Sequence, residues 1–325
     1  MTPAPSEPAP SEPAPPVGAE APDISVIVPH LDQPEALARL LDSLEAQEAH
    51  GVRVEVIVAD NGSRAPLPAA ILGRPGLRVV SQPEPGPGPA RNAGAAVARG
   101  GVLAFTDSDG IADPGWIAAI ARHFARPDAA PVIGGAVGIA LRGPRPDAIE
   151  AFEMVYGYRQ SLYIRRDRYA ATLNLAMRAE VFGRVGGFCG LDMAEDRDWG
   201  QRAHALGIPM AYLPDALILT PARMSLAELA RKWDRVVAHD FAQVRGAGAW
   251  LRWGLRALAV AASPLPEALR IARSDRLSGR DQRLAAFGVL WRIRLHRARR
   301  MLQLAFGADR RALAEGWRKG GGSLP

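Results

Sequence analysis

Residues 24–45 read ISVIVPHLDQPEALARLLDSLE, and this stretch decides the fold class. Ile24 to Pro29 is a short β-branched run that is apolar on both faces, which is typical of a strand buried within a sheet. Pro34 to Ala46 reads as a helix that follows directly. A buried strand followed by a helix is a βα unit, the building block of a mostly parallel sheet.

The same pattern repeats along the next sixty residues. We predict strands at Val54 to Asp60, Leu77 to Ser81 and Val102 to Thr106, with a helix at Pro89 to Ala98. Strands that alternate with helices in this way form an α/β sheet that is covered by helices on both faces. Ligands of such sheets bind at the carboxyl ends of the strands, so polar residues that follow a strand are candidates for a site.

The order of elements is less regular in the middle of the chain. Pro114 to Ala125 is a predicted helix with Pro in its first turn, and Pro131 to Val137 is a predicted strand. A further strand at Asn174 to Arg178 precedes a helix at Glu195 to Leu206. From Ser225 onward the chain reads as helical almost to its end.

Composition limits the class of protein. The chain has 325 residues, of which 48% are hydrophobic and 23% charged, as in globular proteins. Residues 1–22 repeat Ala, Pro, Ser and Glu without an apolar period and are expected to form a disordered tail. Cys189 is the only cysteine, and no stretch offers a secretory leader or the roughly 20 apolar residues that span a bilayer. We therefore expect a cytoplasmic protein.

Charge is distributed unevenly. Residues 222–325 hold 21 Lys and Arg against 8 Asp and Glu, a net of +13, whereas residues 1–221 hold 19 against 26, a net of −7. Within the basic part, apolar residues recur at helical spacing between Arg283 and Phe306: Leu284, Phe287, Trp291, Ala298 and Leu302. This helix, with Trp250 and Trp253, suits the anionic inner face of the cytoplasmic membrane, and packing on the catalytic domain is an equal alternative. Nucleic acid is disfavoured, because no groove-reading motif accompanies the charge.

Two aspartates follow a buried strand. Asp107 and Asp109 are separated by one residue, so both carboxylates can approach one divalent cation, Mg²⁺ or Mn²⁺, that bridges diphosphate oxygens. Such an ion stabilises a departing diphosphate. The alternative is a solvated turn that caps the following helix.

A second acidic pair, Glu195 and Asp196, lies at the start of a predicted helix. Carboxylates are common there because they complement the helix dipole, which is the alternative to a catalytic role. The glycine-rich flank at Gly186 and Gly187 favours a tight approach and a general base, which must come within about 3 Å of the hydroxyl that it activates. Ahead of both acidic motifs in the sequence, a glycine- and proline-rich loop enters a helix that carries Arg91, which is expected to contact phosphate or the metal-site acids.

Six motifs in this order carry a family resemblance. They read SVIVPHLDQPEALARLLDSLEAQ, EVIVADNGS, GPGPARNAG, AFTDSDG, NLAMRAEVFGRVGGF and AEDRDWGQRAHALG. Over about residues 23 to 220 the chain resembles the family 2 glycosyltransferases. These have the GT-A fold and transfer a sugar from a nucleoside diphosphate donor with inversion.

The resemblance implies an organisation and a set of roles. Residues 1–22 would be the tail, 23–222 a GT-A catalytic domain, and 223–325 a basic helical extension. It assigns the donor nucleotide to Pro29, Asp60, Asn61 and Arg91, the donor and metal to Asp107 and Asp109, the base to Asp196 and acceptor support to Glu195. The donor would be a UDP-sugar by preference, and the acceptor a saccharide or lipid-linked saccharide in cell-surface polysaccharide or glycolipid assembly.

The sequence departs from the family at the nucleotide pocket, where Leu31, preceded by His30, occupies the position that is commonly aromatic. The processive Gln-x-x-Arg-Trp motif lacks its Gln at Leu229, which favours transfer of a single sugar. Tyr156, Tyr158 and Tyr163 are candidates for stacking on acceptor sugars, or for ordinary packing. Two other readings stay open: a nucleotidyltransferase, and a catalytically silent protein that binds sugar nucleotides.

Overall fold

The N-terminal half of the sheet is built from parallel strands, as the sequence predicts. In this computed structural model, which describes residues 21–48, 51–191, 193–242, 244–246 and 248–306, they are β1 (Ile24–His30), β2 (Val54–Asp60), β3 (Leu77–Ser81) and β4 (Val102–Phe105). β1 lies between β2 and β4, and β3 pairs with β2. Ile24, Val26 and Ile27 are at most 1% exposed, as expected of a strand covered on both faces. The expected tail at residues 1–22 lies outside the described residues except for its last two.

The rest of the sheet is mixed in direction. Its strands are β5 (Ile111–Ala112), β6 (Val132–Ala140), β7 (Leu175–Arg178) and β8 (Met210–Pro221). The spatial order is β3-β2-β1-β4-β7-β6-β8-β5. β7 runs antiparallel to both β4 and β6, and β5 runs antiparallel to β8, whereas β6 and β8 are parallel. The sheet is therefore mostly parallel, with its reversal next to β4.

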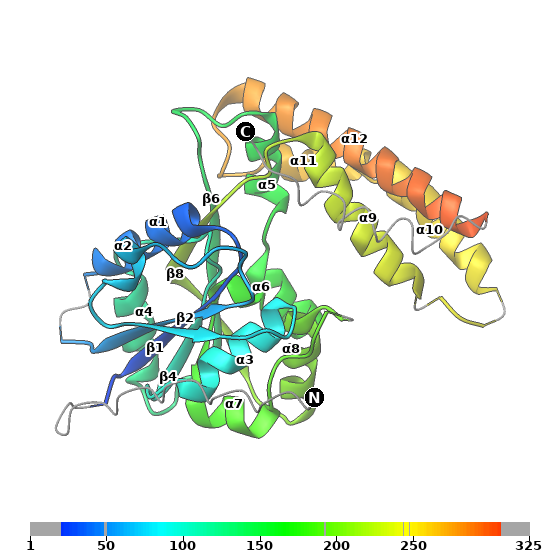
Figure 1. Ribbon diagram of the computed structural model, residues 1–325. Helices are drawn as coiled ribbons and strands as arrows, with labels where there is room; N and C mark the ends of the chain where they lie inside the picture. The colour runs from blue at the N-terminus through cyan, green and yellow to red at the C-terminus, as the bar shows by residue number, and fades with distance from the viewer. Residues whose placement is uncertain (1–20, 49–50, 192, 243, 247, 307–325) are drawn as a thin grey trace, which may run out of the picture.

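Helices cover both faces of this sheet (Figure 1). The first face packs on α1 (Pro34–Glu45), α2 (Ala69–Leu72) and α4 (Trp116–Phe124), and the second packs on α3 (Pro87–Val97), α7 (Ala179–Val185) and α8 (Glu195–Ala205). Alternate residues of β1 serve the two layers, because Val26 and Val28 face the first and Ile27 faces the second. α4 begins at Trp116, two residues later than expected, and Pro114 instead accepts a hydrogen bond at its carbonyl from Glu48.

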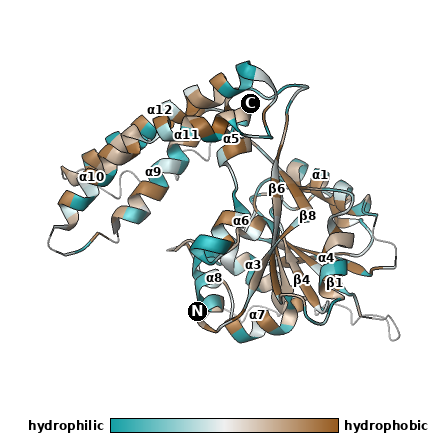
Figure 2. Ribbon diagram, turned by 180° about the vertical axis from the view of Figure 1, so that it is seen from behind, coloured by the Kyte–Doolittle hydropathy of each residue, from teal (hydrophilic) through white to brown (hydrophobic). Residues whose placement is uncertain are grey.

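A helical arm follows the sheet domain. It contains α9 (Leu226–Ala242), α10 (Ala249–Ala262), α11 (Pro264–Ala272) and α12 (Gly279–Ala305), and it is joined by α5 (Ala148–Tyr156) from the sheet domain's own sequence. Short helical turns at Gln160–Leu162, Tyr163–Asp167 and Thr172–Asn174 connect α5 to β7. In Figures 1 and 2 the arm extends away from the sheet as one elongated bundle.

α12 packs against all the other helices of the arm and supplies much of its core. Its buried residues are Ala286, Val289, Leu290, Ile293, Arg297, Ala298, Met301 and Leu304. Of the predicted apolar stripe, Ala298 is buried, but Leu284 is 69% and Trp291 is 39% exposed. Trp253 is also inside the arm, where its indole N–H donates to the carbonyl of Met301 at 2.8 Å. No helix in the described part of the chain is both long and apolar enough to span a membrane.

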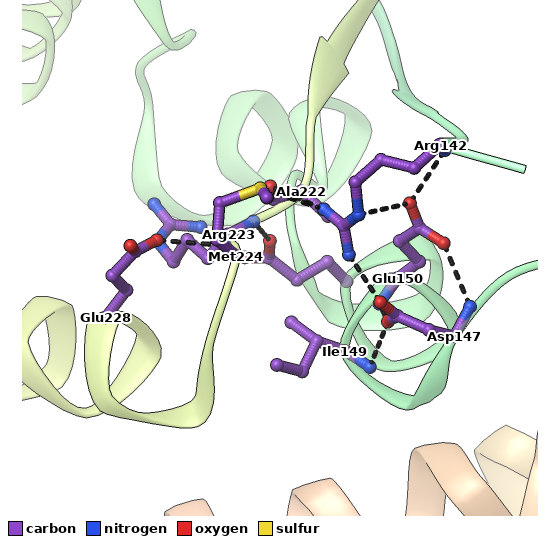
Figure 3. Close-up of polar contacts among 9 residues, drawn as sticks. Arg142, Asp147, Ile149, Glu150, Ala222, Arg223, Met224 and Glu228 are labelled. Carbon is purple, nitrogen blue, oxygen red and sulfur yellow. Dashed lines mark hydrogen bonds and ion pairs between the residues drawn. The ribbon is translucent and has the colours of Figure 1, made fainter. Parts of the chain in front are cut away.

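Two buried glutamates of α5 join the arm to the sheet domain. Glu150 accepts from the backbone N–H of Arg142 at 2.9 Å, and the Arg142 guanidinium also pairs with Asp147 (Figure 3). Glu153 accepts from the backbone N–H of Arg223 at 2.8 Å and pairs with the guanidinium of the same residue. Glu150 and Glu153 are 1% and 2% exposed, and each buried charge is compensated by a cation, Arg142 for Glu150 and Arg223 for Glu153. These ion pairs hold α5 against the segments that follow β6 and β8.

Candidate active site

A cavity of about 530 Å³ opens at the carboxyl ends of β1, β2 and β4. Among its lining residues are seven of the eight that the sequence singles out: Pro29, Asn61, Arg91, Asp107, Asp109, Glu195 and Asp196. Asp60, the eighth, does not line it. The cavity therefore lies at the edge of the sheet where ligands of α/β proteins bind.

Arg91 lies at the centre of the acidic residues. Its guanidinium donates to Asp107 at 2.6 Å and to Glu195 at 2.9 Å, and its side chain is only 3% exposed. A buried guanidinium is stable when carboxylates satisfy it, and each carboxylate is held in place in return. Arg91 thus brings together the two acidic motifs, which the sequence places far apart.

The position of α3 explains how Arg91 reaches that point. Asn92, the next residue, forms two hydrogen bonds of 2.8 Å with the backbone of Phe188, one as donor and one as acceptor. One turn earlier, Gly88 allows close contact, because a Cβ there would lie 2.0 Å from the carbonyl oxygen of Cys189. α3 is thereby pressed against the loop that precedes α8.

α8 is anchored by the same loop. The indole N–H of Trp199 donates to Gly186 at 2.9 Å, and the guanidinium of Arg202 donates to the carbonyls of Val185 and Gly187 at 2.6 and 2.7 Å. Gly186 has a φ of 86°, a conformation that favours glycine. These contacts set the first turn of α8, with Glu195 at its start, against the cavity.

The carboxylates of the cavity affect one another electrostatically. Burial, followed by the charge of Asp107, raises the pKa of Asp109 to about 6, and Arg223 and Arg39 oppose the shift. Burial and the adjacent Glu195 raise the pKa of Asp196 to about 6. Both groups are thus ionised at neutral pH, but only by a small margin. A bound cation would stabilise the ionised form of Asp109, and the raised pKa of Asp196 makes this residue a stronger proton acceptor than an ordinary aspartate.

The β1–β2 end of the cavity is lined by Pro29, His30, Leu31, Asn61, Pro85 and Gly86. Local hydrogen bonds occupy the side chain of Asn61 and that of the neighbouring Asp60. The amide of Asn61 donates to the carbonyls of Gln82 and Glu84 at 2.9 and 2.6 Å and accepts from Gly86 at 2.7 Å. Asp60 accepts from the backbone N–H of Ser63 at 3.2 Å and from its hydroxyl. Asn61 therefore shapes the loop that covers this end.

A comparison with known protein families decides which group the chain belongs to. The sequence model described as "Glycosyl transferase family 2" matches residues 25–192, which is slightly more than half of the chain. The chain belongs to glycosyl transferase family 2. Arg91, Asp107 and Asp109 lie in the matched region, and Glu195 and Asp196 lie a few residues beyond its end.

Several curated glycosyltransferases are similar in sequence. Validoxylamine A glucosyltransferase of Streptomyces hygroscopicus subsp. limoneus is 29% identical over 227 residues, which cover 59% of this chain and 50% of that protein. Glycosyltransferase AglE of Haloferax volcanii is 27% identical over 221 residues, which cover 66% of this chain and 72% of AglE. The chain thus spans about half the length of the first of these relatives.

A solved structure shows the same fold. The mannosyltransferase PcManGT from Pyrobaculum calidifontis, solved with GDP-Man and Mn²⁺, aligns with 93% of this chain and 80% of its own, at a TM-score of 0.51 and 18% identity. The fold of this family 2 member is accordingly GT-A, an α/β sheet with a helical C-terminal region, as the sequence predicts.

The cavity also contains residues that the sequence did not single out as site residues. His30, Ser108 and Thr172 line it. The position of His30, directly after the predicted strand Ile24 to Pro29, was the available signal. Of the tyrosines proposed for sugar stacking, Tyr158 lies in the cavity, whereas Tyr156 stacks on Phe152 and belongs to the arm.

Tyr163 lies outside the cavity lining. Its ring stacks on that of Tyr169 at a centroid distance of 5.1 Å and an angle of 8°.

Proposed function

We propose that this chain is an inverting glycosyltransferase that moves one sugar from a nucleoside diphosphate sugar to a hydroxyl of a saccharide or lipid-linked saccharide, in the assembly of a cell-surface polysaccharide or glycolipid. One observation carries the proposal. Arg91 holds Asp107 and Glu195 within hydrogen-bonding distance, so that the two acidic motifs face one cavity. A carboxylate pair for a donor and a carboxylate for an acceptor are then available in one site.

Asp107 and Asp109 would hold a divalent cation, Mg²⁺ or Mn²⁺. No group of three or more His, Cys, Asp or Glu suited to a metal occurs among the described residues. Two carboxylates nevertheless fit the chemistry, because Mg²⁺ is commonly held by one or two carboxylates together with phosphate and water. The raised pKa of Asp109 marks a surplus of negative charge that a cation relieves. When bound, the ion supplies neutralisation of the donor diphosphate.

Asp196 is the proposed general base. Its Oδ1 accepts the backbone N–H of Arg197 at 2.7 Å, which orients the carboxylate at the start of α8. Asp196 takes the proton of the acceptor hydroxyl while that oxygen bonds to the anomeric carbon and the bond to the diphosphate oxygen breaks. A single in-line displacement of this kind inverts the configuration. Glu195, held by Arg91, is proposed to support the acceptor.

The donor is proposed to be a UDP-sugar, bound with Pro29, Asp60, Asn61 and Arg91 around the nucleotide. Related structures support the donor class, since PcManGT was solved with GDP-Man. The cavity of this chain is lined at the β1–β2 end by Pro29 and Asn61, and elsewhere by Asp107 and Asp109, all of which are proposed to contact the donor.

We also propose that the arm binds the anionic face of the cytoplasmic membrane. Large apolar side chains between 53% and 68% exposed occur on α10 and α11: Trp250, Leu251, Leu255, Leu258, Leu265 and Leu269. Leu251, Leu255 and Leu258 have the spacing of one helical face. The net charge of +13 over residues 222–325 complements anionic lipid. α12, which the sequence prediction singles out, also exposes Leu284 and Trp291.

Calorimetric titration with a panel of nucleoside diphosphates, with and without Mn²⁺, tests the proposal. We expect one nucleotide to bind in a metal-dependent manner to the wild type and to lose that binding in Asp107→Ala/Asp109→Ala. Slow hydrolysis of the matching sugar nucleotide should then depend on Asp196 and vanish in Asp196→Asn. Binding without turnover in any form of the protein would favour a catalytically silent binder. Release of pyrophosphate when a nucleoside triphosphate and a sugar 1-phosphate are supplied instead would favour a nucleotidyltransferase.

A further inference from the structure

His30 is a buried histidine that has no hydrogen-bond partner in the part of the chain that the structure describes. It is the last residue of β1, is 2% exposed and lines the β1–β2 end of the cavity. Its Nδ1 is buried without a hydrogen bond, and neither ring nitrogen bonds to any residue within the described ranges. Buried polar groups are almost always paired, so an orphaned imidazole beside a cavity needs an explanation.

The other polar side chains at this end are occupied. Both amide hydrogens of Asn61 bind loop carbonyls, and Asp60 accepts from Ser63. Leu31 is apolar and 47% exposed, so it can cover a flat ring but cannot hydrogen-bond to one. Among the described residues that line this end, His30 is thus the polar side chain whose nitrogens no protein group uses.

The electrostatic setting defines what His30 can recognise. Burial lowers the pKa of His30, while the charges of Asp60 and Asp32 oppose that effect, so the ring is neutral at pH 7 and above. A neutral imidazole offers one N–H donor and one nitrogen acceptor. Arg64 pairs with Asp32 at 2.8 Å, so Asp60 is the carboxylate that gives this end its negative potential, which repels ring-nitrogen lone pairs and favours ring N–H groups.

We propose that His30 hydrogen-bonds to the nucleobase of the donor and that the base is one with a C(=O)–N–H edge, as in uracil or guanine. Such an edge accepts the imidazole N–H at its carbonyl and presents an N–H to the negative surroundings. Cytosine and adenine present a ring lone pair at the corresponding atom. This inference rests on the proposed function, because it assumes that the cavity takes a nucleotide.

Calorimetry with UDP, GDP, CDP, ADP and inorganic pyrophosphate, all with Mn²⁺, tests the inference on the wild type and on His30→Ala. The loss of one buried hydrogen bond should weaken UDP or GDP binding about tenfold. Pyrophosphate carries no base, so its affinity should change less than about twofold. His30→Gln, which keeps a donor and an acceptor, should fall between the wild type and His30→Ala and serves if the alanine variant does not fold.

The matched control is His123→Ala. His123 is a buried histidine on α4 whose Nε2 contacts the carbonyl of Ala130 at 2.9 Å, and it does not line the cavity. Its removal should leave UDP affinity unchanged. Equal losses of UDP and pyrophosphate in His30→Ala, unchanged UDP affinity, or a wild-type preference for CDP or ADP would each overturn the inference. A wild type that binds no nucleoside diphosphate would overturn the proposed function as well.

Discussion

Arg91 and Glu195 are 104 residues apart in sequence, yet their side chains meet at 2.9 Å. The second guanidinium nitrogen of Arg91 reaches Asp107 at 2.6 Å. One buried cation therefore separates two carboxylates that would otherwise repel each other, and it fixes the distance between the proposed donor side and acceptor side of the site.

Replacement of Arg91 should damage both stability and catalysis. Arg91→Ala leaves Asp107 and Glu195 facing a cavity without their cation, which should lower the free energy of unfolding by about 3 kcal/mol. Transfer should fall at least a hundredfold, because both carboxylates lose their orientation. Urea unfolding and donor turnover measure the two effects.

Arg91→Lys is the informative companion to that variant. Lysine keeps the charge but lacks the planar fork that contacts two carboxylates at once. We expect it to recover most of the stability and little of the activity. Full activity in Arg91→Lys would show that charge alone, without the double contact, is enough.

The pH dependence of transfer should follow Asp196. A general base must be ionised, and the pKa of Asp196 is raised to about 6. Activity should therefore be constant above about pH 7 and fall roughly tenfold per unit below pH 6. A rate profile for the wild type measures this directly, and a rate that is flat down to pH 5 would argue against Asp196 as the base.

The raised pKa of Asp196 also predicts that this residue lowers the stability of the folded protein. Because the pKa of Asp196 in the folded protein lies above its ordinary value of 3.8, folding is penalised as pH rises from about 4 to about 6, and the full penalty remains above that range. Asp196→Asn removes the charge and keeps an oxygen for the Arg197 N–H. Since Asp196 is partly exposed, solvent screens part of the cost, and we expect a gain of about 1 kcal/mol. The gain in unfolding free energy should be present at pH 7.5 and absent at pH 4.

Gly88 offers a test of how α3 is placed. A Cβ at this position would lie 2.0 Å from the Cys189 carbonyl oxygen, so Gly88→Ala must push the loop before α8 away from α3. We expect a loss of about 3 kcal/mol and a loss of activity, because Arg91 then no longer reaches Glu195. Gly183→Ala is the control, since nothing lies within 4 Å of a Cβ there and alanine favours helix α7. Equal effects of the two substitutions would refute the close-contact argument.

The sequence predicts the first four strands of the sheet because each is a short, mainly apolar run that alternates with helical segments. It does not reveal β8, which reads MAYLPDALILTP and carries Pro214 and Asp215 in its middle. The pairing of β8 with β6 shows how these are tolerated. Gly135 pairs with Leu213 and Ala136 with Leu217, so the residues between form a bulge.

Long-range geometry also limits what the sequence can say about the site. The acidic motifs and Arg91 are visible as local patterns, but their contact through one guanidinium depends on how α3 and α8 pack. Helix α12 illustrates the same limit. It has apolar residues on several sides, and only packing shows that Leu290 is buried whereas Leu284 is exposed.

The exposed apolar face of the arm leads to a prediction about membranes. Leu251→Ser/Leu255→Ser/Leu258→Ser removes three side chains that are at least 57% exposed, so the fold should be retained. If these leucines enter the membrane interface, each should contribute about 1 kcal/mol or more, and binding to vesicles with anionic lipid should fall more than tenfold. Co-sedimentation with such vesicles, and with neutral ones, measures this binding.

The matched control removes exposed leucines from the sheet domain instead. Leu72 and Leu206 are both 52% exposed, and Leu72→Ser/Leu206→Ser should leave vesicle binding unchanged. Binding of the wild type should also weaken as salt is raised, because part of it is the attraction of the basic arm to anionic lipid. The membrane proposal would be abandoned if the arm variant bound as tightly as the control, since the apolar face would then have some other partner, such as a second copy of the chain.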